Sequence, residues 1–225
     1  MNTKKITILI ASVITSTILL LGYFAFGFYI MLVFSSGFLT GLLLWIIFPF
    51  HASYQEIRKT FFLTLILFLI HRVEEKYSNF FQALSHITNT PTPEILSWSV
   101  VLLVVLSVGG WLSIPYLLKR NLELGRYLIW TFFAAMGITE LAHILVFPII
   151  INKPFEYFPG MASVFVLAPV ACRSIFLLFL SNVIQLLYFP DFEKKATNRS
   201  TIGRLTTNFY NLSRPILTLS LSGNF

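Results

Sequence analysis

Charged residues are scarce in this chain of 225 residues. Asp, Glu, Lys and Arg make up 11% of it, whereas a soluble domain of this length carries about 25%. Hydrophobic residues make up 56%, and the mean hydropathy is +0.81. So many apolar side chains cannot all be hidden in one aqueous core, because a folded surface still needs polar cover. The composition therefore predicts an integral membrane protein whose main partner is the lipid bilayer.

Cysteine is nearly absent, and the motifs of common soluble enzymes are missing. The single Cys172 lies in an apolar stretch, which excludes a disulfide framework and a CxxC metal site. Nothing in the sequence supports a Ser-His-Asp hydrolase, a P-loop or a dinucleotide fold. The net charge of +7 would suggest a nucleic-acid partner in a soluble protein. Because the basic residues here lie in short loops and the tail, membrane topology explains them and we expect no nucleic-acid binding.

Apolar runs separated by short polar segments predict an all-α membrane bundle of six spans. A spanning helix needs about 20 apolar residues, so the uncharged run from residue 6 to 50 corresponds to two spans and a tight turn. This run exceeds the apolar core of a signal peptide, about 7–15 residues, and we interpret it as a retained anchor. The expected spans are residues 6–24, 28–49, 60–77, 95–118, 127–151 and 161–189.

The basic residues predict the orientation of these spans. Positive charge concentrates on the cytoplasmic side of membrane proteins. With both termini in the cytoplasm, the inner segments hold most of the charge, namely Lys4, Lys5, Arg58, Lys59, Lys119, Arg120, Arg126 and the tail. The outer segments hold little more than Lys76 and Lys153. This asymmetry requires residues 60–77 to cross, since otherwise the basic loop at 119–126 would face outward.

Three parts of the chain follow from this pattern. We expect an N-terminal helical hairpin over residues 1–50, a four-helix membrane core over residues 51–190, and a basic cytoplasmic tail over residues 191–225.

Five ionisable side chains fall at nearly one depth in two of the spans. His71, Glu74 and Glu75 lie about 16–23 Å from the inner end of the third span, at a rise of about 1.5 Å per residue. Glu140 and His143 lie about 20–24 Å from the inner end of the fifth span on the same rise. Because residues three and four apart share a helix face, each helix presents a histidine and a carboxylate together.

Two imidazoles and several carboxylates in one place suit a divalent metal. Zinc and iron both accept histidine nitrogen and carboxylate oxygen, and Glu-x-x-His on facing helices is a unit of metal sites in helix bundles. "ELAH" at 140–143 is one such unit, and "HRVE" at 71–74 is its reverse.

Simpler interpretations of these charges stay open. "HRVEE" at 71–75 could be a helix end whose charges reach the outer interface, because the apolar run before it is short. Glu140 and His143 could form a single structural hydrogen bond. Arg173, midway along the sixth span, could counter the glutamates or bind an anionic group such as a phosphate, or it could reach the cytoplasmic headgroups.

Three sequence features resemble the HXXEE membrane-protein family. They are "HRVEE" at 71–75, the histidine of "TELAH" at 139–143, and "YFPG" at 157–160 before an apolar helix that contains a proline. The resemblance covers roughly residues 60–190. That family consists of prokaryotic multi-span proteins of unknown function that are thought to be enzymes, so the resemblance implies a multi-pass protein of a prokaryotic cytoplasmic membrane.

Carried over from that family, the polar site consists of His71, Glu74, Glu75 and His143. The chain departs from the family pattern in one place. Where the family has an asparagine four residues before the second histidine, this sequence has Thr139, and Glu140 follows it.

The sequence therefore suggests a metal-dependent membrane enzyme, hydrolase-like, that acts on a lipid or lipid-linked substrate. In this hypothesis a zinc or iron ion is held by His71, Glu74, Glu140 and His143. Glu75 or Glu74 acts as the general base, and Arg173 holds an anionic headgroup. The alternatives are a proton- or cation-coupled transporter, because buried Glu and His also serve as ion sites, and a non-catalytic scaffold with structural His/Glu pairs.

Overall fold

The computed structural model describes residues 3–48, 53–151 and 156–188, and these residues contain helices but no strand. The chain divides into two compact units, residues 1–182 and residues 183–225. The second unit is described only where the last helix ends, at Tyr188. The basic tail expected over residues 191–225 therefore lies outside the described residues.

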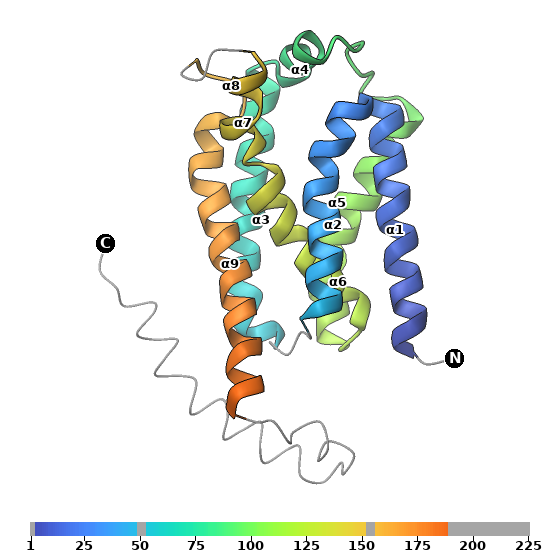
Figure 1. Ribbon diagram of the computed structural model, residues 1–225, viewed down its shortest axis with the longest axis vertical. Helices are drawn as coiled ribbons and strands as arrows, with labels where there is room; N and C mark the ends of the chain where they lie inside the picture. Colours follow the sequence, from blue (N-terminus) through green and yellow to red (C-terminus); the bar gives the residue numbers. More distant parts are fainter. Residues whose placement is uncertain (1–2, 49–52, 152–155, 189–225) are drawn as a thin grey trace, which may run out of the picture. The chain divides into compact units, whose positions relative to one another are not determined.

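The first unit is built from long helices joined by short connections (Figure 1). The N-terminal pair is α1 (Thr3–Phe26) and α2 (Phe28–Ile47), which meet at Gly27. The third long helix, α3 (Tyr54–Tyr77), is followed by the short α4 (Phe80–Thr88) and by α5 (Trp98–Lys119). A segmented stretch comes next: α6 (Glu123–Ala134), the π-helix η1 (Ala135–Thr139), α7 (Ala142–Leu145) and α8 (Phe147–Ile150). The last helix is α9 (Met161–Tyr188).

Five of these segments are long and apolar enough to cross a membrane. They are Lys4–Phe26, Phe28–Ile47, Trp98–Lys119, Glu123–Ile150 and Met161–Leu180. The prediction of an all-helical protein with several membrane-compatible helices is thus confirmed. The third expected span is not among the five, although α3 is 24 residues long, because charged residues occupy both ends of that helix and leave a short apolar centre.

The stretch that begins with α6 is the most deeply buried part of the unit. Every residue from Tyr127 to Gly137 is buried, and α6 packs against α2 and α5. The Tyr127 hydroxyl bonds to Thr15 of α1 at 2.8 Å, and Phe132 packs against both Phe61 of α3 and Trp111 of α5. A helix that is apolar on all sides belongs in the interior of a bundle, so this stretch forms the centre around which the outer helices pack.

A π-turn interrupts this central stretch just before its first ionisable residue. The Glu140 N–H donates to the Ala135 carbonyl at 3.2 Å, a bond that spans five residues. At Gly37 of α2, an added Cβ would lie 2.7 Å from the Ala135 Cα, so only glycine allows this approach. Single π-turns often mark functional sites, and here the turn ends at Glu140. The expected fifth span over residues 127–151 is therefore a series of short helices rather than one straight helix.

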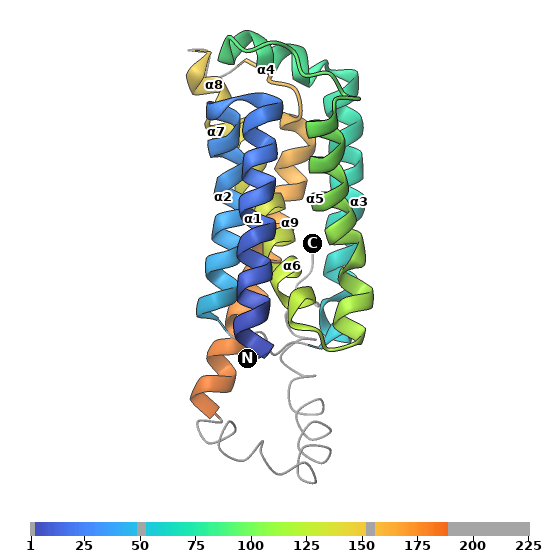
Figure 2. The same cartoon turned by 90° about the vertical axis from the view of Figure 1, so that its right-hand side faces the viewer.

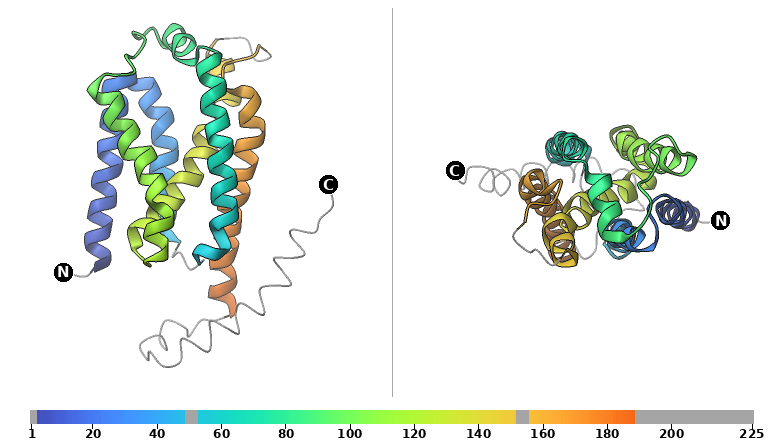
Figure 3. Two further views of the ribbon diagram at one scale, coloured as in Figure 1. Left: turned by 180° about the vertical axis from the view of Figure 1, so that it is seen from behind. Right: turned by 90° about the horizontal axis from the view of Figure 1, so that it is seen from above.

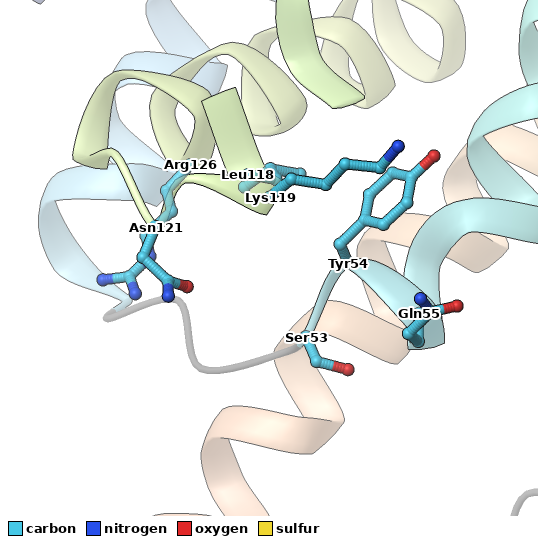
Figure 4. Close-up of a pocket in the computed structure, with 7 residues that line it drawn as sticks. All are labelled: Ser53, Tyr54, Gln55, Leu118, Lys119, Asn121 and Arg126. Carbon is cyan, nitrogen blue, oxygen red and sulfur yellow. The ribbon is translucent and has the colours of Figure 1, made fainter. Parts of the chain in front are cut away.

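The helix α3 extends from one end of the unit to the other. Its first turn shares a small cavity of about 270 Å³ with the end of α5 and the start of α6 (Figure 4). The cavity is lined by Ser53, Tyr54, Gln55, Leu118, Lys119, Asn121 and Arg126. At the opposite end, α4 continues from α3, and its Phe81 stacks on Phe26 at the end of α1, with ring centroids 5.8 Å apart. Figures 2 and 3 show α4 lying across this opposite end.

Candidate metal centre

Four buried side chains from three segments converge on one point. His71 and Glu75 lie one turn apart on α3 and share a face. Glu140 follows the π-turn, and His143 lies on α7, three residues later. The exposed fractions of these four residues are 0%, 5%, 6% and 3% in chain order. The ionisable residues expected at one depth in the third and fifth spans thus include two histidines and two glutamates that lie together in the structure.

The distances within this group suit coordination of one ion. His71 Nε2 lies 3.0 Å from Glu140 Oε2 and 3.4 Å from Glu75 Oε1. His143 Nε2 lies 3.3 Å and 3.4 Å from the same two oxygens. One ligand atom from each of the four residues lies within 4.8 Å of the other three. In a tetrahedral zinc site with metal–ligand distances of about 2.0–2.1 Å, neighbouring ligand atoms lie about 3.3–3.4 Å apart.

Hydrogen bonds at the Nδ1 atoms of the two histidines set the orientation and the tautomer of both imidazole rings. His143 Nδ1 lies 2.6 Å from the Pro159 carbonyl, which can only accept, so this nitrogen carries a hydrogen. His71 Nδ1 lies 2.9 Å from the Ser163 Oγ, whose hydroxyl reaches the Gly160 carbonyl at 3.3 Å. With Nδ1 donating in each ring, a neutral imidazole directs its Nε2 lone pair at the carboxylates. Such outer hydrogen bonds are typical of metal-bound histidines.

Two buried atoms of the group face each other without a well-aligned hydrogen bond. They are His71 Nε2 and Glu75 Oε1, which lie 3.4 Å apart. An unpaired buried polar atom costs about 1–3 kcal/mol, and a lone pair facing a carboxylate adds repulsion. A cation at the shared point would bind both atoms at once, so the donor set fits a divalent metal.

Arg72 joins the two carboxylates through the oxygens that face away from this point. Its Nη1 lies 2.7 Å from Glu75 Oε2, and its Nη2 lies 2.9 Å from Glu140 Oε1. Each carboxylate therefore has one oxygen on the guanidinium and one directed at the histidines. Two carboxylates and one guanidinium leave one net negative charge beside neutral imidazoles, which favours a cation there. The arginine holds each glutamate ready to bind through a single oxygen.

Glu74 points away from this group and caps α9. Its carboxylate accepts hydrogen bonds from the Ala162 and Ser163 N–H groups, at 3.1 Å and 2.7 Å, and from the Tyr157 hydroxyl at 2.6 Å. Desolvation and the bond to Glu74 raise the pKa of Tyr157 above its ordinary value, so this hydroxyl keeps its hydrogen at neutral pH. A carboxylate at a helix N-terminus satisfies free N–H groups and complements the helix dipole. The place expected for Glu74 among the ligands is thus occupied by Glu75.

Arg173 is likewise not brought to the group. It lies on α9 ten residues after Ser163, about 15 Å further along at the rise of an α-helix, and its side chain is exposed. The arginine of this site is Arg72, which the sequence interpretation passed over because its partner Glu140 is 68 residues away. Its spacing of three from Glu75 on one helix was the only sequence signal for it.

Aromatic side chains cover the group at the end of the unit where α4 lies. Phe80 of α4, Phe147 of α8 and Phe158 all contact the His143 ring, with centroids 5.0 Å, 5.3 Å and 6.0 Å away. All three are buried. Gly160, with φ of 92°, lies against both imidazoles, and an added Cβ would be 2.6 Å from His143 Nδ1. The "YFPG" turn thus contributes Phe158, which covers His143, and Gly160, whose backbone lies against both imidazoles.

The cavity at the start of α3 is separate from this group. Tyr54, at its edge, precedes His71 by seventeen residues, which is about 25 Å of helix. The two cations that line the cavity already have partners: Lys119 lies over the Tyr54 ring, and Arg126 pairs with Glu123. The cavity therefore marks a helix end rather than part of the His/Glu site.

Comparisons of the chain with protein-family models, with curated proteins and with solved structures found no match.

Proposed function

We propose that this chain is a membrane protein that binds one divalent metal, with zinc as the best fit, through His71, Glu75, Glu140 and His143. The observation that supports it is the convergence of two buried Nε2 atoms on two carboxylate oxygens at 3.0–3.4 Å. The second oxygens are held by Arg72. Histidine and carboxylate ligands with polar outer partners are the pattern of protein zinc sites.

The function that this site supports best is hydrolysis of a lipid or lipid-linked molecule. A bound divalent metal supplies a Lewis acid and lowers the pKa of a water molecule toward neutrality. Catalytic zinc sites have three protein ligands and leave the fourth position to water, so we assign His71, Glu140 and His143 as the ligands kept during catalysis. We assign Glu75 to accept the proton once water takes its place among the ligands, because Glu74 is committed to α9. The phenylalanines around His143 exclude bulk water and keep the site dry.

The proposal places the site within a bundle of six spans, with α3 as the third. The start of α3 lines a cavity with the end of α5, and α4, which follows α3, meets the end of α1. The α3 helix of 24 residues is about 36 Å long at 1.5 Å per residue, enough for a bilayer core of about 30 Å. The basic loops then place both termini in the cytoplasm. Membership of the HXXEE family is part of the same proposal.

Metal content tests the metal site directly. Protein purified in detergent should carry close to one zinc per chain, and His143→Ala should carry almost none. The matched control is His86→Ala, because His86 is an exposed histidine on α4. Equal metal in wild type and His143→Ala would overturn the assignment.

Lipid turnover separates an enzyme from a scaffold. Metal-loaded protein in vesicles of mixed phospholipids should release cleaved lipid, detected by mass spectrometry, and His143→Ala should not. Full metal content without turnover of any lipid would favour a structural ion. Metal transport into sealed vesicles would instead support a transporter.

A further inference from the structure

The proposed function does not say from which side a substrate reaches the His/Glu group. The two sides of the group differ in how tightly they are covered. All four members of the group are at least 94% buried. At the end where α4 lies, three buried phenylalanines stand over His143. Beside them, the Gly160 backbone lies against both imidazoles so closely that a single methyl group has no room. This end of the site is therefore closed to water.

Arg72 provides the connection to the outer surface of the bundle. Its guanidinium contacts Glu75 and Glu140 directly, yet 38% of its side chain is exposed. It shares a face of α3 with Leu69, three residues before it, and Val73 follows it on the adjacent side of the helix. Those two side chains are 56% and 54% exposed. Large apolar side chains exposed on a helix of a membrane protein face lipid, so Arg72 emerges among lipid-facing side chains.

Arg72 also retains capacity to bind a further group. A guanidinium has five N–H donors in a planar fork. The two ion pairs use one hydrogen on each terminal nitrogen, at 2.7 Å and 2.9 Å. The remaining N–H groups can therefore hold an anionic oxygen while the carboxylates stay bound. An amphiphile with an anionic headgroup is the ligand class that suits this position, because its chains can remain in lipid while its headgroup meets Arg72.

We infer that the site is reached sideways from the bilayer past Arg72, by an amphiphile with an anionic headgroup, and not from water at the α4 end. This inference rests on the proposed metal site. It adds the route, the first residue that the substrate meets, and the class of substrate.

A pair of chelators with the same donor atoms tests the route. Zinc-loaded full-length protein in lipid nanodiscs, which leave both membrane faces open to water, is mixed with bathophenanthroline or with its disulfonate. The first partitions into lipid and the second stays in water. Each rate of zinc loss is divided by the rate at which the same chelator removes zinc from a small water-soluble zinc complex. Bathophenanthroline should remove zinc at least tenfold faster than the disulfonate.

Two variants and one control locate the route. Leu69→Trp narrows the lipid side of Arg72 and should slow removal by bathophenanthroline several-fold, whereas the control Val104→Trp, at an exposed position on α5, should not. Phe80→Ala opens the α4 end and should speed removal by the disulfonate. Equal normalised rates for the two chelators in wild type would overturn lateral access while leaving the metal site intact. Failure of wild type to hold zinc would overturn the proposed function itself.

The substrate class is tested by competition in the same nanodiscs. Raising the content of an anionic phospholipid such as phosphatidylglycerol, at constant total lipid, should slow bathophenanthroline several-fold in wild type and have no effect in Arg72→Gln. Free phosphate in the buffer should not protect the zinc. Protection by phosphate alone, or equal protection in Arg72→Gln, would overturn the role of Arg72.

Discussion

Arg72 and Glu140 form an ion pair at 2.9 Å although 68 residues separate them in the chain. The same guanidinium holds Glu75 at 2.7 Å, so one side chain orients a carboxylate from α3 and a carboxylate from the segment after the π-turn. Outer partners of this kind typically change metal affinity by about 10–100-fold. Two metal ligands therefore depend on a residue that does not bind the metal itself.

Replacement of Arg72 should weaken metal binding without abolishing it. We expect Arg72→Ala to lower zinc affinity about 10–100-fold, because each carboxylate loses the hydrogen bond that fixes its second oxygen and so directs its first oxygen at the metal. The zinc affinity of Arg72→Lys should lie between those of wild type and Arg72→Ala, since a single ammonium cannot form the planar fork that bridges both carboxylates. Zinc titration against a competing chelator measures the affinity. Unchanged affinity in Arg72→Ala would show that the carboxylates are positioned by something else.

The two neighbouring glutamates of "HRVEE" should behave differently. Glu75→Gln removes a charged ligand and should lose most of the bound metal. Glu74→Gln should keep the metal and lose about 1–2 kcal/mol of stability, because it weakens the charged cap on α9. Metal analysis and thermal unfolding in detergent, run on both variants, separate the roles. Loss of metal in Glu74→Gln with Glu75→Gln fully loaded would reverse the assignment made from the structure.

The helices and most of the candidate site could be predicted from the sequence. The same physical reasons explain which features could not be predicted. Apolar runs and basic loops are strong signals because the bilayer core excludes charge. The matched depth of His71 and His143 followed from a fixed helical rise. The choice between Glu74 and Glu75 did not follow, because positions three and four after His71 both share its face.

Features that depend on contacts distant in sequence could not be predicted. The π-turn before Glu140 lies against Gly37 of α2, and no local pattern encodes this contact. Arg173 was assigned to the site because it is a charge in an apolar run, yet its side chain is exposed. Arg72 was overlooked because its role depends on Glu140, in another helical segment.

Gly160 should be essential for metal binding even though it has no side chain. Gly160→Ala would place a Cβ 2.6 Å from His143 Nδ1 and 2.8 Å from His71 Cε1, at a φ of 92° that favours glycine. Both imidazoles must move, so we expect the metal to be lost. Gly109→Ala is the matched control, because nothing lies within 4 Å of its added Cβ. Metal analysis of the two variants checks this, and a fully loaded Gly160→Ala protein would contradict the packing described.

Gly37 should influence the metal from a helix that provides none of its ligands. In Gly37→Ala the new Cβ would meet the Ala135 Cα at 2.7 Å and crowd Thr139, which bonds to Ser36. Because the π-turn cannot move without shifting Glu140, we expect a loss of about 1–3 kcal/mol of stability from overpacking together with weaker zinc binding. Gly22→Ala, whose nearest neighbour is 3.9 Å away on Phe34, is the control on α1. If Gly37→Ala loses stability but binds zinc as tightly as wild type, α2 supports the fold alone and Glu140 is positioned by Arg72 and the histidines.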